Sequence, residues 1–534
     1  MGVFAFMPAG SGGIIIRVES DIRRGIPGID ISGLAEGAVR EARDRVRVAF
    51  RNSGFSFPLD RILINLAPAG LKKDGAALDL PIALSVMSAA GIAPVSGNLL
   101  VMGELELSGR IRPVRGVLAA IAAGLAEGIT EFIVPAENAG EAAILASTGN
   151  LAGKGARFTA AENLQGAVHA LFIREEKGAL PASLEIAKTG GDVCSNIAGD
   201  PGGDFSDVRG QFIYKRALEI AAAGGHNVLV FGPPGAGKTM LARRMPSIMA
   251  PLTPDEAVEV TRLHSLAGPH QNNNGFIDCL ITNPPFRAPH HTASAEGILG
   301  GGRIPRPGEI SLAHFGVLFL DEAPEFRINV LQALREPLED RVISIVRAEG
   351  PVHLPAEFQL LLTANSCRCG RLGIRETENS CLCSPEEITR YWRKFGGALL
   401  DRVEIRIPIL PPKIDEMGKK GLSGSEENSA VIARRVKAAI EIQRHRFKGT
   451  EIRRNALIPA SKAFAMCPMN EKAENAFHAA VSKLGLSGRA YHGILRVARS
   501  IADLDGKDII ETEHILEAVH HRRLGEDPWD ILSM

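Results

Sequence analysis

The alternation of hydrophobic and polar positions predicts short strands and alanine-rich helices in the first third of the chain. Within residues 1–170, three runs have the apolar, β-branched composition of strands: Ile14–Val18, Arg61–Leu66 and Glu131–Val134. Val117–Gly128 instead has apolar residues three and four positions apart, which is the spacing of an amphipathic helix. Strands that alternate with helices are typical of an α/β or α+β domain.

Two polar segments divide the rest of the chain. Residues 171–207 are rich in Gly, Ser and Asp and have no hydrophobic periodicity, so we expect a linker. Residues 208–412 return to alternating strands and helices, as in a second α/β domain. Residues 413–534 open with a polar break, then have helical spacing over Val431–Phe447, and Ser487 is a suitable N-cap for a further helix. We therefore expect a C-terminal helical domain.

No segment has the pattern of a membrane span or of a targeting signal. The longest uncharged stretch, Leu80–Gly103, contains prolines and serines, and a buried helix, a loop and a strand explain it better. The first cation is Arg17, so the apolar start lacks the basic region of a signal peptide. We expect a cytoplasmic protein with no membrane partner.

The most specific motif is a glycine-rich loop between an apolar run, Asn227–Phe231, and a helical pattern that begins at Met240. Its residues are Gly232, Pro233, Pro234, Gly235, Ala236, Gly237, Lys238 and Thr239. This context predicts a P-loop, in which glycines expose backbone N–H groups to phosphate. Lys238 would then reach the β- and γ-phosphate oxygens, and Thr239 would be a ligand of Mg²⁺.

Two further strands end in side chains that suit the same chemistry. Val317–Leu320 is followed by Asp321, which could hold hydrated Mg²⁺, and by Glu322, which could polarise an attacking water. Asn365 follows the apolar run Phe358–Leu362, and its amide could orient that water. The alternatives are an ordinary strand that ends in acidic residues and an asparagine that caps a turn. The P-loop upstream favours the catalytic interpretation.

Charge and cysteine content change this picture in two places. Lys plus Arg and Asp plus Glu are both 61, so the net charge is zero and any nucleic-acid contact must come from a local patch. Seven cysteines are too few for a disulfide scaffold, but four of them form two close pairs. Cys367, Cys369, Cys381 and Cys383 can provide the thiolates of a structural zinc site. Four unliganded cysteines in a polar loop are the alternative.

An unusual insertion lies between the P-loop and Asp321. Residues 284–309 contain a pair of histidines and a glycine-rich turn. His290 and His291 could bind a metal ion, but no carboxylate or cysteine lies at ligand spacing. We expect a mobile loop instead.

The chain as a whole resembles AAA+ ATPases of the magnesium-chelatase-like group, and among them the YifB/ComM family. The resemblance rests on GHNVLVFGPPGAGKTMLARR, RAPHHTASAEGILGGG, RPGEISLAHFGVLFLDEAPEF, LREPLEDRVISIVRA and LLDRVEIRI. It implies an α/β fold with an AAA+ P-loop NTPase core over 208–412 and a helical lid over 413–534. It also implies ATP and Mg²⁺ as cofactors and an ATP-dependent homo-oligomer, expected to be a hexamer.

The resemblance assigns roles to individual residues. It implies that Asp321 and Glu322 form the Walker B motif and that Asn365 is sensor 1. It further implies that Arg402 is an arginine finger that reaches a neighbour's ATP and that Arg489 is sensor 2. The alternative for both arginines is a solvated surface side chain.

Residues 1–170 resemble the catalytic domain of Lon proteases, an α/β fold of the ribosomal-S5 type. The matching text includes KDGAA, GELELSGRIRPV and FIVPAEN. Ala77 stands where those proteases carry the nucleophilic serine, and Leu118 stands where they carry the activating lysine. A Ser–Lys dyad needs both an oxygen nucleophile and a base, so we expect an inactive domain and no peptidase activity.

One segment favours a DNA motor over two other functions. Arg341–Gly350 resembles the pre-sensor-1 hairpin of MCM-type helicases, in which a basic tip residue, here Arg347, touches DNA. Arg303 and Arg306 on the insertion could form a second ring of phosphate contacts. We therefore expect a motor on single-stranded or branched DNA, a helicase or branch-migration translocase in recombination or DNA uptake. The alternatives are a protein-remodelling ATPase and a magnesium-chelatase-type motor subunit.

Overall fold

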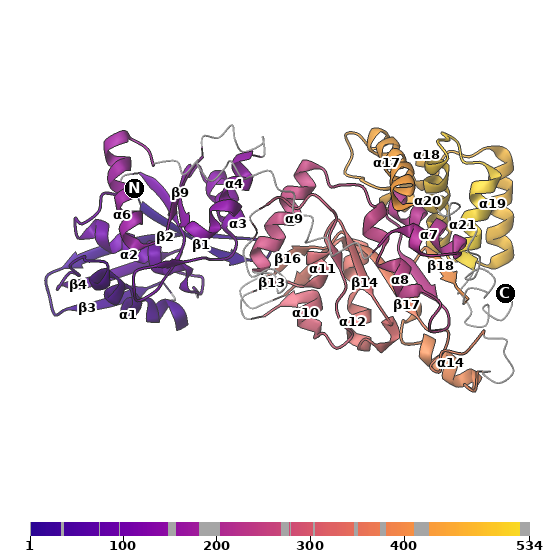
Figure 1. The fold of residues 1–534 in the computed structure, drawn as a ribbon, viewed down its shortest axis with the longest axis horizontal. Coiled ribbons are helices and arrows are strands. Elements are labelled where there is room, and N and C mark those ends of the chain that lie inside the picture. The colour runs from indigo at the N-terminus through magenta and orange to yellow at the C-terminus, as the bar shows by residue number, and fades with distance from the viewer. Residues whose placement is uncertain are drawn as a thin grey trace.

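The computed structural model has three parts, of which the first lies at one end of the longest axis and the other two lie together toward the other end (Figure 1). They are an N-terminal α/β domain, a central α/β domain and a C-terminal helical domain. The structure describes residues 2–33, 37–73, 75–95, 97–147, 156–180, 203–268, 277, 279–302, 305–346, 351–373, 381–410 and 427–523.

A seven-stranded mixed sheet in the order β3-β4-β2-β1-β5-β8-β9 forms the N-terminal domain. Its strands are β1 (Gly2–Ala9), β2 (Gly12–Arg23), β3 (Gly28–Ser32), β4 (Arg61–Ala67), β5 (Asn98–Val101), β8 (Glu131–Pro135) and β9 (Arg157–Ala161). A short hairpin pairs β6 (Glu104–Leu105) with β7 (Ile111–Arg112). The strands predicted at 14–18, 61–66 and 131–134 are confirmed.

Helices cover both faces of this sheet. Successive side chains of a strand point to opposite sides, and apolar side chains on both sides have to be buried. They are α1 (Gly37–Asn52), α2 (Asp79–Ala89), α3 (Val117–Ala126), α4 (Ala139–Ser147) and α6 (Leu164–Lys177). Val3 and Ala5 of β1 join the core under α1, α2 and α6, whereas Phe6 joins the core under α3 and α4. The helix predicted at 117–128 is α3, and the uncharged stretch 80–103 divides into α2, a loop and β5 as predicted.

Five parallel strands in the order β11-β14-β17-β10-β18 form the central sheet. They are β10 (Val228–Phe231), β11 (Phe286–Arg287), β14 (Val317–Leu320), β17 (Gln359–Ala364) and β18 (Ile405–Pro408). All residues of β10, β14, β17 and β18 are buried, as expected for a parallel sheet that is covered on both faces. Val228 and Val230 face the core shared with the C-terminal domain, whereas Leu229 and Phe231 face the opposite core.

Short helices and two hairpins surround the central sheet. The helices are α7 (Phe212–Gly224), α8 (Lys238–Ala242), α9 (Pro254–Ala267), α10 (Ala295–Leu299), α11 (Glu309–Leu312), α12 (Ile328–Ala333), α13 (Arg335–Asp340), α14 (Pro385–Trp392) and α15 (Gly397–Leu400). The hairpins are β12 (Gly300–Gly301) with β13 (Arg306–Pro307), and β15 (Val342–Ile345) with β16 (Val352–Pro355). The short 3₁₀ helices η4 (Phe205–Asp207), η5 (Met245–Ile248), η6 (Ala323–Glu325) and η8 (Asn455–Leu457) occur in the central and C-terminal domains.

The insertion is folded in its described part, which differs from the mobile loop that we expected. Ile298 of α10 is fully buried, and β12 pairs with β13. Arg287 donates two hydrogen bonds to Glu309, from Nε at 2.7 Å and from Nη2 at 2.8 Å. This bidentate ion pair and the buried isoleucine hold the insertion on the central sheet.

Helices build the C-terminal domain: α17 (Ser429–Arg446), α18 (Ala460–Met466), α19 (Glu471–Leu484), α20 (Gly488–Leu504) and α21 (Thr512–Arg523). The predicted helix at 431–447 is α17, and Ser487 caps α20 by accepting a hydrogen bond from the Ala490 N–H. Within the described ranges, no helix has the length and apolar character needed to cross a membrane.

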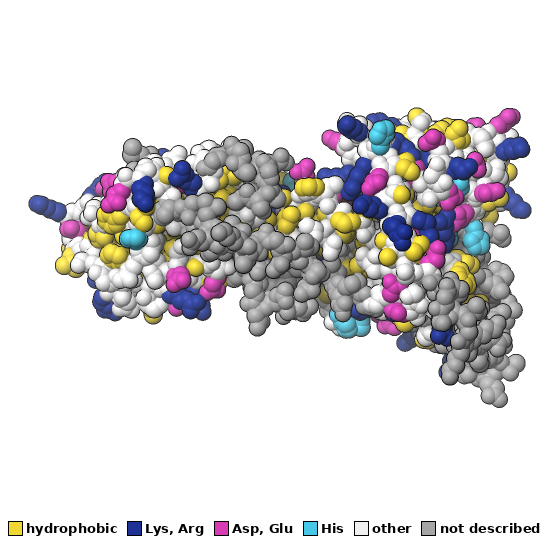
Figure 2. Space-filling view, turned by 45° about the horizontal axis from the view of Figure 1, so that its top comes forward, with side chains coloured by type: hydrophobic (Ala, Val, Ile, Leu, Met, Phe, Trp, Pro, Cys, Tyr) yellow, Lys and Arg dark blue, Asp and Glu magenta, His cyan; other side chains and the backbone are white. Residues whose placement is uncertain are grey.

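Folded elements lie at both ends of the segment that we expected to be a linker. Residue 170 lies inside α6, whose apolar residues pack in the same core as α1 and α2, so the first domain includes this helix. At the other end, Phe205 is buried in the central core and its N–H donates to Ser429 Oγ at 2.9 Å. The chain is therefore already anchored to the lid before residue 208. Figure 2 shows Lys and Arg mixed with Asp and Glu over the visible face, in keeping with the zero net charge.

Candidate active site

The predicted P-loop lies at the carboxyl edge of the central sheet, between β10 and α8. Gly232 must be a glycine, because a Cβ atom there would lie 2.1 Å from the Ile409 carbonyl oxygen. Gly235 and Gly237 have φ values of +78° and +87°, in the left-handed region that other residues rarely adopt. The next residues begin α8, and Met240 on its first turn is exposed.

Lys238 is the cation of this loop and is almost fully buried. Its ammonium group donates to the carbonyl oxygens of Gly232 and Pro233, both at 2.8 Å, and to Asn365 Oδ1 at 3.1 Å. Burial lowers the pKa of Lys238 to about 8, against the opposing effect of Asp321 and Glu322. The lysine is therefore a cation held among neutral oxygen acceptors and two nearby carboxylates.

Thr239 and Asp321 place two kinds of oxygen ligand side by side. The Thr239 hydroxyl donates to Asp321 Oδ1 and Oδ2 at 2.9 and 3.1 Å. The Thr363 hydroxyl at the end of β17 donates to Asp321 Oδ1 at 2.5 Å and so fixes this carboxylate from the neighbouring strand. A hydroxyl next to a carboxylate is a donor set that Mg²⁺ prefers, so these residues fit the ion that the sequence predicts.

Glu322 and Asn365 lie at the ends of adjacent strands. Leu320 pairs with Leu362 in the register of β14 and β17, so the residues that follow emerge at one edge of the sheet. Glu322 has a φ of 49°, and its N–H donates to Thr363 Oγ1 at 3.0 Å. A glutamate in the left-handed region is strained, and such strain is concentrated at functional sites. The structure therefore brings Lys238, Thr239, Asp321, Glu322 and Asn365 together.

Two residues that we did not predict from the sequence hold the backbone of the P-loop through hydrogen bonds. The hydroxyl of Tyr214 on α7 is buried and donates to the Lys238 carbonyl oxygen at 3.0 Å. Gln211 precedes α7 with a φ of 53°, and its amide donates to the carbonyl oxygens of Ala236 and Leu410 at 3.3 and 2.9 Å. Neither residue belongs to a local motif, so only the folded chain identifies them.

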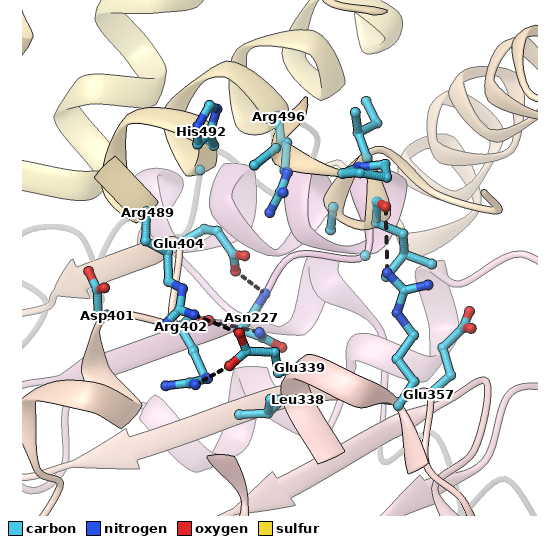
Figure 3. Close-up of a pocket in the computed structure, with 18 of the residues that line it drawn as sticks. Asn227, Leu338, Glu339, Glu357, Asp401, Arg402, Glu404, Arg489, His492 and Arg496 are labelled. Carbon is cyan, nitrogen blue, oxygen red and sulfur yellow. Dashed lines mark hydrogen bonds and ion pairs between the residues drawn. The ribbon is translucent and has the colours of Figure 1, made fainter. Parts of the chain in front are cut away.

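Arg402 and Arg489 meet in a cavity of about 530 Å³ at the opposite edge of the sheet (Figure 3). Arg402 precedes β18, and its carbonyl oxygen accepts a hydrogen bond from the side-chain amide of Asn227, which directly precedes β10. Both guanidinium groups pair with one carboxylate, Glu339 on α13; the bond from Arg489 Nη2 to Glu339 Oε1 is 2.9 Å. The strands are parallel, so Arg402, which precedes β18, lies at the amino edge of the sheet, whereas the P-loop follows β10 at the carboxyl edge. Neither arginine therefore reaches the phosphate site of its own chain.

A third arginine of this cavity was not anticipated. Arg496 follows Arg489 by two helical turns on α20, and Figure 3 shows both on the face of α20 that lines the cavity. Burial lowers the pKa of Arg496, although Glu404 opposes the effect. The spacing of seven residues is a signal that the sequence contained, since residues seven apart lie on one helix face.

The four predicted zinc ligands form one cluster. Their Sγ atoms all lie within 4.8 Å of one another, and the Sγ atoms of Cys369 and Cys381 are each within 3.5 Å of that of Cys367. Cys383 completes the group. Four sulfur atoms at such distances fit the tetrahedral coordination of a structural Zn²⁺ ion with no open position.

The cysteine cluster is joined to the P-loop. Gly370 has a φ of +77°, and a Cβ atom there would lie 2.7 Å from Cδ of Pro234 in the P-loop. On the other side, the Trp392 indole of α14 donates to the Ser366 carbonyl oxygen at 3.0 Å. The Asn365 N–H donates to the Tyr391 hydroxyl at 3.3 Å. The cluster is thus in contact with both the phosphate loop and the strand end that carries Asn365.

The remaining predicted residues have different positions. The rings of His290 and His291 lie 4.1 Å apart, but in the described part of the chain the only cluster of metal-ligating side chains is the cysteine group. Arg306 is exposed on β13. Arg303 and Arg347 lie outside the described residues.

The two positions that carry the Ser–Lys dyad in Lon proteases have apolar side chains here. Ala77 lies in η1 (Ala76–Leu78), and Leu118 is buried in α3. Lys73 is fully buried, and its ammonium group donates to the carbonyl oxygens of Gly33 at 2.9 Å and Leu71 at 2.8 Å and to that of Pro68. This lysine is committed to backbone acceptors and cannot serve as a general base for residue 77.

The parallel sheet, the P-loop and the helical lid define an AAA+-type P-loop protein of the magnesium-chelatase-like class. Residues 204–417 match the family model for magnesium chelatase, subunit ChlI. Residues 18–138 match the model for subunit ChlI of Mg-chelatase, and residues 426–522 match the model for its C-terminal part.

Known proteins identify the family within this class. Competence protein ComM of Haemophilus influenzae is 39% identical over 515 residues, which cover 96% of this chain and 95% of that protein. Protein YifB of Salmonella typhimurium is 40% identical over 515 residues, with 95% and 94% covered. Lon protease of Salinispora arenicola is 28% identical over 136 residues, which cover 24% of this chain and 18% of that protein. The chain belongs to the YifB/ComM family, and its N-terminal domain is Lon-like.

Proposed function

We propose that this protein is an ATP-hydrolysing ring motor that acts on DNA. The observation that carries the proposal is the division of one site between two edges of the central sheet. The P-loop and Walker B side chains lie at the carboxyl edge, while the arginines lie at the amino edge. A complete site then requires two copies of the chain, as in a closed ring with head-to-tail contacts.

Each side chain at the carboxyl edge has a distinct role in this proposal. The backbone N–H groups from Gly235 to Thr239 would bind the phosphates, since Pro233 and Pro234 have no N–H, and Lys238 would turn from the loop carbonyls to the β- and γ-phosphate oxygens. Thr239 and Asp321 would hold Mg²⁺, whose charge would neutralise that of the phosphates. Glu322 takes a proton from the attacking water, and Asn365 orients that water.

The arginines would complete the site of the neighbouring copy. Glu339 pairs with both Arg402 and Arg489 and so holds the two guanidinium groups close together. Arg402 would stabilise the charge that develops on the γ-phosphate, and Arg489 and Arg496 would contact the remaining phosphates. This arrangement supports a homo-oligomer, and a hexamer is the expected ring.

DNA is the proposed substrate for two reasons. Antiparallel pairing of β15 and β16 supports the hairpin that the sequence predicted, and its strands lead to the predicted contact residue Arg347. One relative that spans nearly the whole chain is named a competence protein. We infer a helicase or branch-migration translocase in the cytoplasm; remodelling of proteins and metal insertion are the alternatives that the experiment below excludes or supports.

ATPase turnover with and without DNA tests this function. We expect wild-type turnover to rise when single-stranded DNA or a four-way junction is added. Glu322→Gln should bind ATP but not hydrolyse it, because no base activates the water. Arg347→Glu should reduce the ratio of DNA-stimulated to basal turnover to about one, since a reversed charge repels phosphate. Wild-type turnover that is insensitive to both DNA substrates would contradict the DNA assignment but not the ATPase assignment.

A further inference from the structure

A second cationic site lies between the Lon-like domain and the central domain. A cavity of about 410 Å³ is lined on one side by β1, by the loop around Ala77 and by Arg115. On the other side it is lined by Leu266 of α9 and by Arg306 of β13. The cavity therefore lies beside the position that carries the nucleophile in Lon proteases, and the central domain closes it.

Two arginines face this cavity without an anionic partner among the described residues. In the part of the chain that the structure describes, neither Arg115 nor Arg306 forms an ion pair or a side-chain hydrogen bond. Glu104 also lines the cavity, but it pairs with neither arginine. The charge of Arg306 opposes that of Arg115, and an anion bound between the two guanidinium groups would offset this repulsion.

The position of Arg115 is fixed by the domain contact. Its side chain lies against the carboxyl end of α9, where a Cβ atom on Gly268 would come within 2.6 Å of Arg115 Nε. Gly268 has a φ of +96°, so both its backbone geometry and the arginine favour glycine at this point. Burial lowers the pKa of Arg115, and the charge of Arg306 lowers it further. The Arg115 side chain is thus partly desolvated and lies close enough to Arg306 for the two charges to repel each other.

The turn between β1 and β2 joins the cavity to the hairpin that we assign to DNA. Gly10, in the turn between β1 and β2, lines the cavity, and a Cβ atom on it would lie 2.6 Å from Cγ1 of Val352 in β16. The neighbouring Ser11 hydroxyl donates to the His353 carbonyl oxygen at 3.3 Å. A DNA strand that contacts the hairpin would therefore lie close to the cavity.

We propose that Arg115 and Arg306 form a phosphate-binding site for a DNA strand, so that the Lon-like domain extends the DNA path of the motor. The proposal rests on the proposed function and adds a contact from a domain to which no role was assigned. A DNA strand fits better than a peptide, because its backbone provides a phosphate at every nucleotide, whereas a peptide backbone is neutral. Contacts of this kind are independent of base sequence.

Binding of a fluorescein-labelled oligothymidylate to the full-length chain tests the site. The chain carries Glu322→Gln and is saturated with ATP and Mg²⁺, so that the assembly does not turn over. Arg115→Ala and Arg306→Ala should each weaken binding by about tenfold, and the slope of log affinity against log salt should fall by about 0.7 for each phosphate that is no longer neutralised. Arg115→Lys and Arg306→Lys should restore most of the affinity, because lysine keeps the charge.

A matched control removes the same charge elsewhere. Arg157 begins β9 on the same domain but does not line the cavity, and Arg157→Ala should leave both affinity and slope unchanged. Thermal unfolding of Arg115→Ala reports any weakening of the domain contact, and Arg306, which is exposed, provides the variant that does not disturb folding. Equal affinities for wild type and Arg306→Ala would overturn the proposal.

Two further outcomes separate this site from the proposed function and from a small anion. If Arg347→Glu abolishes DNA binding while both cavity variants bind as wild type, the motor acts on DNA but the cavity does not. If the cavity variants lose affinity for inorganic pyrophosphate and keep their affinity for the oligonucleotide, the ligand is a small phosphate compound, and the DNA path is refuted. If neither the wild type nor any variant binds the oligonucleotide, the proposed function itself is refuted.

Discussion

Lys238 is held by two backbone carbonyls and Asn365, and burial lowers its pKa to about 8. Phosphate prefers the protonated lysine, so ATP should raise this pKa again when it binds. Because the free enzyme loses the proton above pH 8, affinity for ATP should be constant near neutral pH and fall by about tenfold at pH 9.

Isothermal titration calorimetry in buffers of different ionisation enthalpy measures this effect. At pH 8.5, ATP binding should take up a proton from the buffer, and at pH 7 it should take up little, because Lys238 is already charged. Glu322→Gln provides a protein that does not turn over ATP during the titration. Proton uptake that is the same at both pH values would show that the buried lysine is not the titrating group.

Single residues of the carboxyl edge could be predicted because their chemistry is encoded locally. The glycines and Lys238 lie in one short loop, and Asp321 and Asn365 each follow an apolar strand. Glu339 and Tyr214 could not be predicted, because their partners lie far away in sequence and only the fold brings them together. Arg496 was missed although its spacing from Arg489 pointed to the same helix face.

At the scale of elements, the cysteine loop is coupled to the phosphate loop by contact between Gly370 and Pro234. We expect one zinc ion per chain, and Cys369→Ser together with Cys383→Ser should remove it, since the removal of two thiolates leaves an incomplete shell. Release of the ion should unfold the loop, because structural-zinc binding is coupled to local folding. ATP affinity should then fall, since the P-loop is no longer supported by its neighbour.

Elemental analysis and fluorescent-nucleotide binding on the same samples check this prediction. Cys467→Ser is the matched control, because Cys467 is a buried cysteine in the core of the lid and lies outside the ligand cluster. It should keep the metal. A zinc-free double variant that binds ATP as tightly as wild type would show that the cluster does not support the P-loop.

The lid is held by a buried ionic network around Asp503 of α20. This carboxylate accepts hydrogen bonds from Arg446 on α17 at 2.8 and 2.5 Å, from Arg499 Nε at 3.1 Å and from Asn455 at 2.8 Å. Arg499 is fully buried, so Asp503→Ala leaves a buried cation without its counter-charge. We expect a decrease of about 3–5 kcal/mol in the free energy of unfolding.

Chemical denaturation of the full chain measures this decrease in the transition of the lid. Lys507→Ala is the control, because Lys507 forms an exposed pair with Glu511 and such pairs contribute about 0–1 kcal/mol. Equal effects of the two substitutions would mean that the buried network does not stabilise the lid.

At the scale of the whole molecule, domain types could be predicted but the junctions between domains could not. The apolar periodicities indicated the α/β domains and the lid, since each periodicity reflects one element. The junction between the first two domains depends on pairs such as Glu141 of α4 and Ser265 of α9, which are 124 positions apart. Glu141 is buried and also accepts from the Leu118 N–H at 2.9 Å, so its surroundings come from three separate segments. No local pattern encodes such a junction.

The division of the ATP site between two copies can be tested by mixing two inactive proteins. Arg402→Ala lacks the finger but keeps Glu322, and Glu322→Gln lacks the base but keeps Arg402. Each homogeneous ring should be almost inactive, because a finger supplied in trans contributes about 10³–10⁵ in rate in GTPases. In a ring of both proteins, a site is complete where an Arg402→Ala copy receives Arg402 from a Glu322→Gln neighbour.

With equal amounts and random assembly, half of the sites have an intact Glu322, and half of these have a neighbour with an intact Arg402, so about a quarter of all sites are complete. If the sites act independently, the mixture should recover roughly a quarter of the wild-type rate. ATPase turnover measured against the mixing ratio should be greatest near equal amounts and should vanish at both ends. Adding a Glu322→Gln copy that also carries Arg402→Ala is the control and should restore nothing. If that control restores turnover as well as the single variant does, or if the mixture stays inactive while forming ATP-dependent oligomers, Arg402 does not act on a neighbour's ATP.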